Sequence, residues 1–110
     1  METAAIVLSV DQAQTEEFEA GFREHELPTW IDFQEKGVLV GACLQRMDIS
    51  SQPRSGAQQY LVVAIFATEE GHHFHDRDPR FQKWDQLADS FQVAPAMAFA
   101  GETILKVGLS

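Results

Sequence analysis

The residues of this sequence best suited to chemistry are its histidines, and His25 has the most distinctive setting. Within residues 16–36, Phe18, Phe22, His25, Thr29 and Phe33 recur at spacings of three and four. At about 100° per residue, this spacing predicts a helix with His25 on the same face as the phenylalanines. A neutral imidazole in an apolar pocket can act as a general acid or base near pH 7. The alternative is a partly buried histidine that is hydrogen-bonded to a backbone carbonyl.

The other three histidines form a cluster with an aspartate. His72 and His75 are one helical turn apart, and Asp76 follows His72 by four residues. This spacing can place two imidazoles and a carboxylate around one metal ion, so His72, His75 and Asp76 are weak metal candidates. A histidine of this cluster, with His73 as our candidate, could instead supply a base at a pocket mouth. The third interpretation is a solvated segment without a function, and we expect neither a metal nor a cofactor.

Four aromatic residues have positions from which they could line a pocket for a flat organic ligand: Phe22, Trp30, Phe66 and Trp84. Aromatic residues at helical spacing are more often part of the core, so that alternative stays open. Tyr60 and Arg46 are predicted on strands, where either could orient a carbonyl or carboxylate group. We take Tyr60 as a possible assistant in catalysis and Arg46 as a ligand-binding residue.

The composition excludes several classes of protein. The chain has 110 residues, which predicts a single domain over 1–110, and 8 basic against 17 acidic residues give a formal net charge of −9. An acidic surface argues against binding to nucleic acids or anionic membranes, and no apolar run is long enough to span a bilayer. The single cysteine, Cys43, excludes an internal disulfide, and the start of the chain lacks the features of a secretion signal. A cytoplasmic protein is therefore expected.

The hydrophobic pattern predicts the element order β-α-β-β-α-β. Strands are predicted at 4–10, 38–49, 59–68 and 97–108, and helices at 16–36 and 68–91. Pro28 predicts a kink or a joint between two helices near residues 26–27. Asp78 and Pro79 predict a new helix start inside the second helical region. The order is that of a ferredoxin-like α+β fold, with an antiparallel sheet and helices on one of its faces.

The third strand is apolar on both faces, and this decides how the sheet is covered. Tyr60, Val62, Ala64 and Phe66 alternate with an equally apolar set on the other side. A sheet with one solvated face should alternate apolar with polar residues. Helices cover only one face, so we expect the other face to pair with a second copy of the chain or with a separate partner.

The element order, chain length and doubly apolar sheet resemble the dimeric α+β barrel superfamily over nearly the whole chain. The segment at 75–84, HDRDPRFQKW, also resembles the start of the second helix in small members of this group. The resemblance implies a ferredoxin-like dimer similar to antibiotic-biosynthesis-type monooxygenases and polyketide cyclases. Haem-degrading members use an asparagine, and the sequence contains no asparagine, which argues against that activity. A shared fold does not identify the reaction.

Two classes of function follow. The first is a small cofactor-independent enzyme, of monooxygenase, cyclase or isomerase type, that acts by proton transfer on a hydrophobic, aromatic or polyketide-like small molecule. In this class His25 would move the proton, assisted by His73 or Tyr60. The second is a non-catalytic small-molecule-binding or accessory protein. An open cavity reached by His25 would favour the enzyme.

Overall fold

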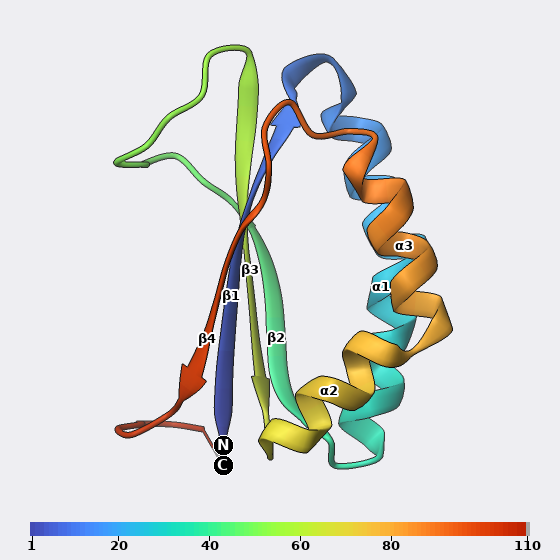
Figure 1. The fold of residues 1–110 in the computed structure, drawn as a ribbon, viewed down its shortest axis with the longest axis vertical. Coiled ribbons are helices and arrows are strands. Elements are labelled where there is room, and N and C mark those ends of the chain that lie inside the picture. Colours follow the sequence, from blue (N-terminus) through green and yellow to red (C-terminus); the bar gives the residue numbers. More distant parts are fainter. Residues whose placement is uncertain (110) are drawn as a thin grey trace.

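The computed structural model describes residues 1–109 and has two layers, a sheet and a layer of helices on one of its faces (Figure 1). Its strands are β1 (Glu2–Asp11), β2 (Leu39–Arg46), β3 (Ala57–Phe66) and β4 (Met97–Glu102). Its helices are the short 3-10 helix η1 (Gln12–Gln14), α1 (Thr15–Glu35), α2 (Glu69–Arg77) and α3 (Pro79–Asp89). No helix in this described part of the chain is both long and apolar enough to cross a membrane.

The sheet has the strand order β2-β3-β1-β4, and all neighbouring strands are antiparallel. β1 lies between β3 and β4, while β2 and β4 form the two edges. This is the ferredoxin-like arrangement that the sequence predicts, so the α+β fold class is confirmed.

The long helix α1 runs through Pro28 as a single helix. The predicted joint between two helices is therefore wrong. Pro28 is exposed, so water can satisfy the carbonyl that loses its partner there. The buried residues Phe22 and Trp30, on either side of Pro28, both belong to the main core. This shared packing holds the two halves of α1 in one element.

The second helical region divides where the sequence predicts. The Thr68 hydroxyl accepts a hydrogen bond from the Gly71 amide at the start of α2, at 3.0 Å. The Asp78 carboxylate caps α3 by accepting from the Arg80 amide at 2.8 Å, and Pro79 occupies the first helical position. The two caps fix the turn that brings α2 across the end of the sheet (Figure 1).

Two strand predictions need correction. A bulge between Leu39 and Gly41 shifts the register of β2, so Leu39 pairs with Phe66 and is buried. Strict alternation along residues 38–49 would place Leu39 on the opposite face, with Gly41 and Cys43. The last strand ends at Glu102 instead of continuing to residue 108, because Glu102 pairs with Glu2 and β1 offers no further partner.

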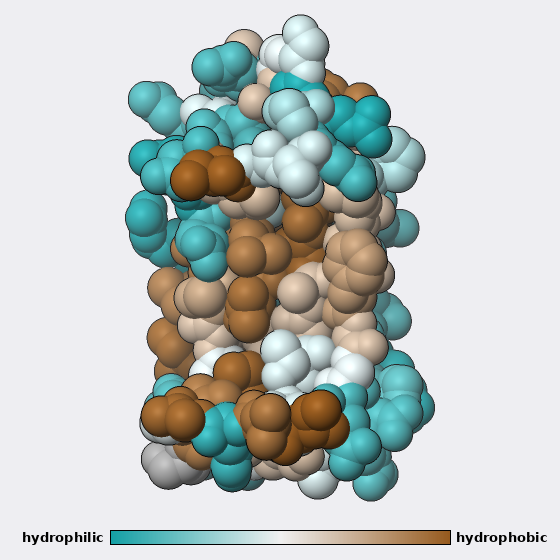
Figure 2. All heavy atoms as spheres, turned by 90° about the vertical axis from the view of Figure 1, so that its left-hand side faces the viewer, coloured by the Kyte–Doolittle hydropathy of each residue, from teal (hydrophilic) through white to brown (hydrophobic). Residues whose placement is uncertain are grey.

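The two faces of the sheet have different surroundings. The helix side holds the core, which includes Leu8, Tyr60, Val62 and Phe66. The opposite face is not covered by any element of the described chain, and Figure 2 shows a hydrophobic band along its centre. By the strand register, this open face carries Ala5, Val7, Cys43, Leu61, Val63, Ile65, Met97 and Phe99.

Candidate active site

A cavity of about 190 Å³ lies between the sheet and the helices. Its apolar walls come from the helix-facing sides of β1, β3 and β4 and from aromatic side chains of α1 and α3. The lining residues are Ala4, Ile6, Leu8, Phe22, Glu26, Trp30, Val62, Ala64, Phe66, His72, His75, Asp76, Phe81, Trp84, Asp85, Ala88, Asp89, Gln92, Ala96 and Ala98. An apolar cavity with a few convergent polar groups is the usual form of a small-molecule site.

A buried histidine–glutamate pair forms one part of the cavity wall. His75 of α2 and Glu26 of α1 are only 6% and 3% exposed. The Nε2 atom of His75 lies 3.1 and 3.2 Å from the two carboxylate oxygens of Glu26. The rings of Phe81 and Phe66 pack against the imidazole, with centroids 4.3 and 5.6 Å away. Such dry surroundings strengthen every electrostatic interaction of the pair.

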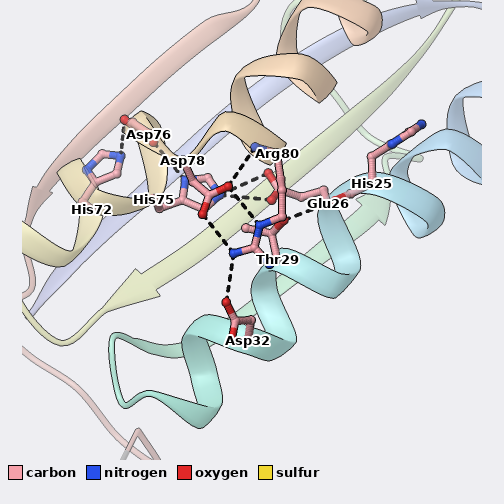
Figure 3. Close-up of polar contacts among 9 residues, drawn as sticks. All are labelled: His25, Glu26, Thr29, Asp32, His72, His75, Asp76, Asp78 and Arg80. Carbon is pink, nitrogen blue, oxygen red and sulfur yellow. Dashed lines mark hydrogen bonds and ion pairs between the residues drawn. The ribbon is translucent and has the colours of Figure 1, made fainter.

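Asp76 links this pair to a second histidine (Figure 3). One carboxylate oxygen of Asp76 lies 3.0 Å from Nδ1 of His75, and the other lies 3.2 Å from Nε2 of His72. The Nδ1 atom of His72 contacts the carboxylate of Glu2. The result is a continuous chain of alternating carboxylates and imidazoles, which we call the relay cluster: Glu2, His72, Asp76, His75 and Glu26.

The surroundings of His75 favour its charged form. Burial alone would lower the pKa of His75, but the hydrogen bonds to Asp76 and Glu26 raise this pKa to about 9. Burial raises the pKa of Glu26 above its ordinary value, although the hydrogen bond from His75 acts against this. His75 is therefore a protonated imidazolium at neutral pH, with both ring N–H groups facing carboxylates. Shifted titrations of two facing groups in a cavity wall are typical of catalytic sites.

The predicted aromatic residues lie together at the cavity. Phe22, Trp30, Phe66 and Trp84 all line it. Phe22 meets both indoles edge-on, with ring centroids 5.0 Å from Trp30 and 5.7 Å from Trp84. They are also buried members of the core, so the two interpretations of these residues are compatible. His72, His75 and Asp76 line the same cavity.

His25 and His73 lie elsewhere. His25 is not among the residues that line the cavity; its ring stacks on the indole of Trp84, with centroids 5.7 Å apart. Figure 3 shows His25 pointing away from His75 and Glu26. His73 has a half-exposed side chain, 3.7 Å from Glu69. Their catalytic roles remain predictions from the sequence.

Tyr60 and Arg46 meet at another glutamate of α1. The buried Tyr60 hydroxyl donates to Glu19, and Arg46 donates to both carboxylate oxygens of Glu19 at 2.7 and 2.8 Å. Neither Tyr60 nor Arg46 lines the cavity. Burial and the contact with Glu19 raise the pKa of Tyr60 to about 12, so its hydroxyl keeps its proton at neutral pH.

The proposed metal ligands contact one another directly. The carboxylate of Asp76 lies between the two rings, 3.2 Å from Nε2 of His72 and 3.0 Å from Nδ1 of His75. Over residues 1–109, no group of three or more histidine, cysteine or acidic side chains has an arrangement that could hold a metal ion.

Glu26 is the central residue that the sequence reasoning missed. It follows Phe22 by four residues and precedes Trp30 by four, so helical periodicity places it on the buried face as well as it places His25. Glutamates are rarely buried without a partner, so the residue type itself gives no indication of burial. Its partner, His75, comes 49 residues later, and no local pattern connects the two.

Comparisons with known proteins find the same fold and no close sequence relative. No family model and no curated protein sequence matches this chain. A candidate antibiotic biosynthesis monooxygenase from Nitrosomonas europaea has a TM-score of 0.75 at 11% identity, over 97% of this chain and 93% of that one. A mutant of SnoaB, a cofactor-independent oxygenase from Streptomyces nogalater, has a TM-score of 0.67 at 13% identity, over 97% of each chain.

HapK from Hahella chejuensis is similar at 21% identity, with a TM-score of 0.70 over 100% of this chain and 98% of that one. These identities establish the fold and leave the reaction open. The chain thus has the ferredoxin-like α+β fold that is found in structures of antibiotic biosynthesis monooxygenases.

Proposed function

We propose that this protein is a small cofactor-independent enzyme that binds a mainly apolar molecule in the cavity and transfers a proton to or from it. The observation that carries the proposal is the position of the buried Glu26–His75 pair, with the more exposed Asp76 beside it, in an apolar cavity wall. SnoaB is described as a cofactor-independent oxygenase and has the same fold, which supports this class of chemistry. Oxygenation, cyclisation and isomerisation of an enolisable substrate all begin with such a proton transfer.

The geometry suggests a role for each residue of the site. A substrate carbonyl that replaces Asp76 at Nδ1 of His75 would receive a hydrogen bond from the imidazolium. The displaced carboxylate of Asp76 would then lie beside the substrate and accept its carbon-bound proton, while the enolate oxygen would be stabilised by His75. Glu26 would keep Nε2 of His75 occupied and the ring charged. Asp76 is suited to move because its side chain is 46% exposed.

A second candidate function is binding without catalysis. It is favoured by the full pairing of His75, whose two ring nitrogens both face carboxylates. In that case the relay cluster would hold α1 and α2 together, and the cavity alone would carry the function.

We also propose that the working unit is a homodimer formed through the open face of the sheet. This face carries Val7, Leu61, Ile65 and Phe99, and the Phe99 side chain is 62% exposed. A contiguous apolar surface of this kind is typical of an interface with another chain. The molar mass in solution, measured by light scattering, tests this: twice 12.3 kDa is expected, and a monomer at micromolar concentration would contradict it.

Binding can be tested with the protein's own fluorescence. Trp30 and Trp84 are the two tryptophans of the chain, and both line the cavity. A ligand that enters should therefore change the tryptophan emission without background from other sites. Phenylacetone is a suitable probe because it is apolar and enolisable, and because a cavity of about 150 Å³ already holds benzene. Saturable quenching is expected, and the absence of any response to such probes would contradict the proposal.

Catalysis is tested separately by deuterium exchange. In deuterated water, the wild type should accelerate loss of the benzylic CH₂ signal of phenylacetone in the NMR spectrum. Asp76→Asn should remove the acceleration, and Glu35→Gln, an exposed glutamate at the end of the same helix as Glu26, is the matched control. Binding without accelerated exchange would favour the second candidate function. Loss of exchange in His25→Gln or His73→Gln would move the proton transfer to those residues.

A further inference from the structure

Apart from its histidines, every ionisable side chain that lines the cavity is acidic. Four carboxylates line it: Glu26, Asp76, Asp85 and Asp89. Neither lysine nor arginine is found among its lining residues in the described chain. Arg80 lies close by, but its guanidinium is bound by Asp32 and Asp78, both at 2.9 Å. The His75 imidazolium already faces Glu26 and Asp76, so among the described lining residues Asp85 and Asp89 are left without a cation.

The carboxylates of this wall repel one another. Burial, together with the neighbouring charges of Asp89 and Asp76, raises the pKa of Asp85 above its ordinary value. Asp85 and Asp89 are one helical turn apart on α3, where like charges disfavour each other. Within residues 1–109, neither of these two aspartates forms an ion pair. A positive charge placed among them would relieve the repulsion.

Gln92 gives the same wall a second polar feature, a buried acceptor atom that receives no hydrogen bond. Gln92 lines the cavity, and its Oε1 is buried without a hydrogen-bond partner among the described residues. Its Nε2 donates to Asp89 at 3.2 Å, which fixes the orientation of the amide, because the reversed amide would place two oxygens against each other. A buried acceptor without a partner is unfavourable. It would be satisfied by a ligand that brings an N–H group.

The aromatic wall suits the same kind of ligand. Trp30 and Trp84 both face the cavity, and a cation over an indole ring is attracted by its π electrons. We infer that the cavity selects an apolar molecule that carries an amine, bound as its ammonium ion near Asp85, Asp89 and Gln92. This inference rests on the proposed function, since it names the class of ligand for the same cavity.

The test uses three probes of one shape and different charge: benzylamine, benzyl alcohol and benzoate. Binding is followed by tryptophan emission at pH 7 and low ionic strength, with excitation at a wavelength that the probes do not absorb. We expect benzylamine to bind about five-fold or more tightly than benzyl alcohol, because two exposed ion pairs and a cation–π contact each contribute modestly. Benzoate should bind more weakly than the alcohol.

Three variants locate the selectivity. Asp85→Asn combined with Asp89→Asn should bring the affinity for benzylamine close to the affinity for benzyl alcohol. Glu35→Gln combined with Glu70→Gln makes the same change in net charge outside the cavity and should keep the preference for the amine. Gln92→Leu removes the Oε1 acceptor together with the Nε2 donor to Asp89, and it should weaken binding of the amine more than binding of the alcohol, because the ammonium is the stronger hydrogen-bond donor of the two probes.

The outcomes separate this inference from the proposed function. Equal binding of benzylamine and benzyl alcohol by the wild type would overturn the inference and leave the apolar site intact. Loss of the preference in the Glu35 and Glu70 control would also overturn it, because the preference would then reflect overall charge. No binding of any of the three probes would contradict the proposed function itself.

Discussion

Two glutamates on α1 lie seven residues apart, and each is at the centre of a polar cluster with a different character. Glu19 is held by Tyr60 and by Arg46, whose side chain is 62% exposed. Hydrogen bonds from Tyr60 and Arg46 lower the pKa of Glu19. Glu26 is held by His75 in surroundings without a lysine or arginine among the cavity-lining residues, and burial raises its pKa.

The difference shows what separates a structural cluster from a candidate catalytic one on the same helix. A permanent guanidinium fixes the charge of Glu19, so that cluster has one protonation state near neutral pH. An imidazole can gain or lose its proton, so the cluster at Glu26 has two accessible states. Only the second cluster lies in the wall of a cavity.

The largest expected effect comes from breaking the buried pair. His75→Leu should lower the free energy of unfolding by about 3 kcal/mol, because it leaves the carboxylate of Glu26 buried without its partner. Combining it with Glu26→Leu should recover at least half of this loss, since the orphaned charge is removed. Urea denaturation at fixed protein concentration measures both. If the double variant lost the sum of the two single-variant losses in free energy of unfolding, the two residues would not act as a pair.

The next effect concerns catalysis. His75→Gln should slow the enzyme-dependent deuterium exchange of phenylacetone by about 100-fold, because the imidazolium that stabilises the enolate is replaced by a neutral amide. The exchange is followed by NMR, and binding of the ketone is measured in parallel by tryptophan fluorescence. An unchanged rate with unchanged binding would remove His75 from the mechanism.

The pH dependence of stability should distinguish the two clusters. The pKa of His75 rises from its ordinary 6.5 to about 9 on folding, so folded protein binds this proton more tightly. The stabilisation by this proton is complete below pH 6.5 and is lost as the pH rises through about 9, which lowers the free energy of unfolding by about 3 kcal/mol. Urea denaturation across this range should show the decline in the wild type. A similar decline in the combined His75→Leu and Glu26→Leu variant would assign it to other groups.

The smallest effect is expected at the other cluster. Tyr60→Phe should lower the free energy of unfolding by about 1 kcal/mol, because it removes one hydrogen bond while Arg46 still holds Glu19. Thermal or urea denaturation measures this. A loss above about 3 kcal/mol would mean that the structural cluster is as strongly coupled as the buried pair.

The sequence predicted the fold because its signals are local. The cap at Asp78 and Pro79 and the alternation from Tyr60 to Phe66 each depend on a few neighbouring residues. The errors came where tertiary packing decides: α1 continues through Pro28, and β4 ends where β1 offers no further partner.

The site was only partly predictable for the same reason. The spacing of His72, His75 and Asp76 identified a chemical cluster, and the four aromatic residues at the cavity were among the candidates. Glu26 was not predicted as a site residue because its partner, His75, is 49 residues away in the sequence. The helical spacing was compatible with either His25 or Glu26 on the buried face of α1. Tertiary packing decides which of the two adjacent residues is buried.

The central claim is that His75 is a charged group tuned by Glu26 and Asp76 in the cavity wall. It is tested most directly by following the ring nitrogen resonances of ¹⁵N-labelled histidine by NMR as the pH is raised. His75 should stay protonated to about pH 9, and Glu26→Gln should lower this midpoint. A His75 that titrates near its ordinary value of about 6.5, unaffected by Glu26→Gln, would contradict its assignment as a charged group tuned by these carboxylates.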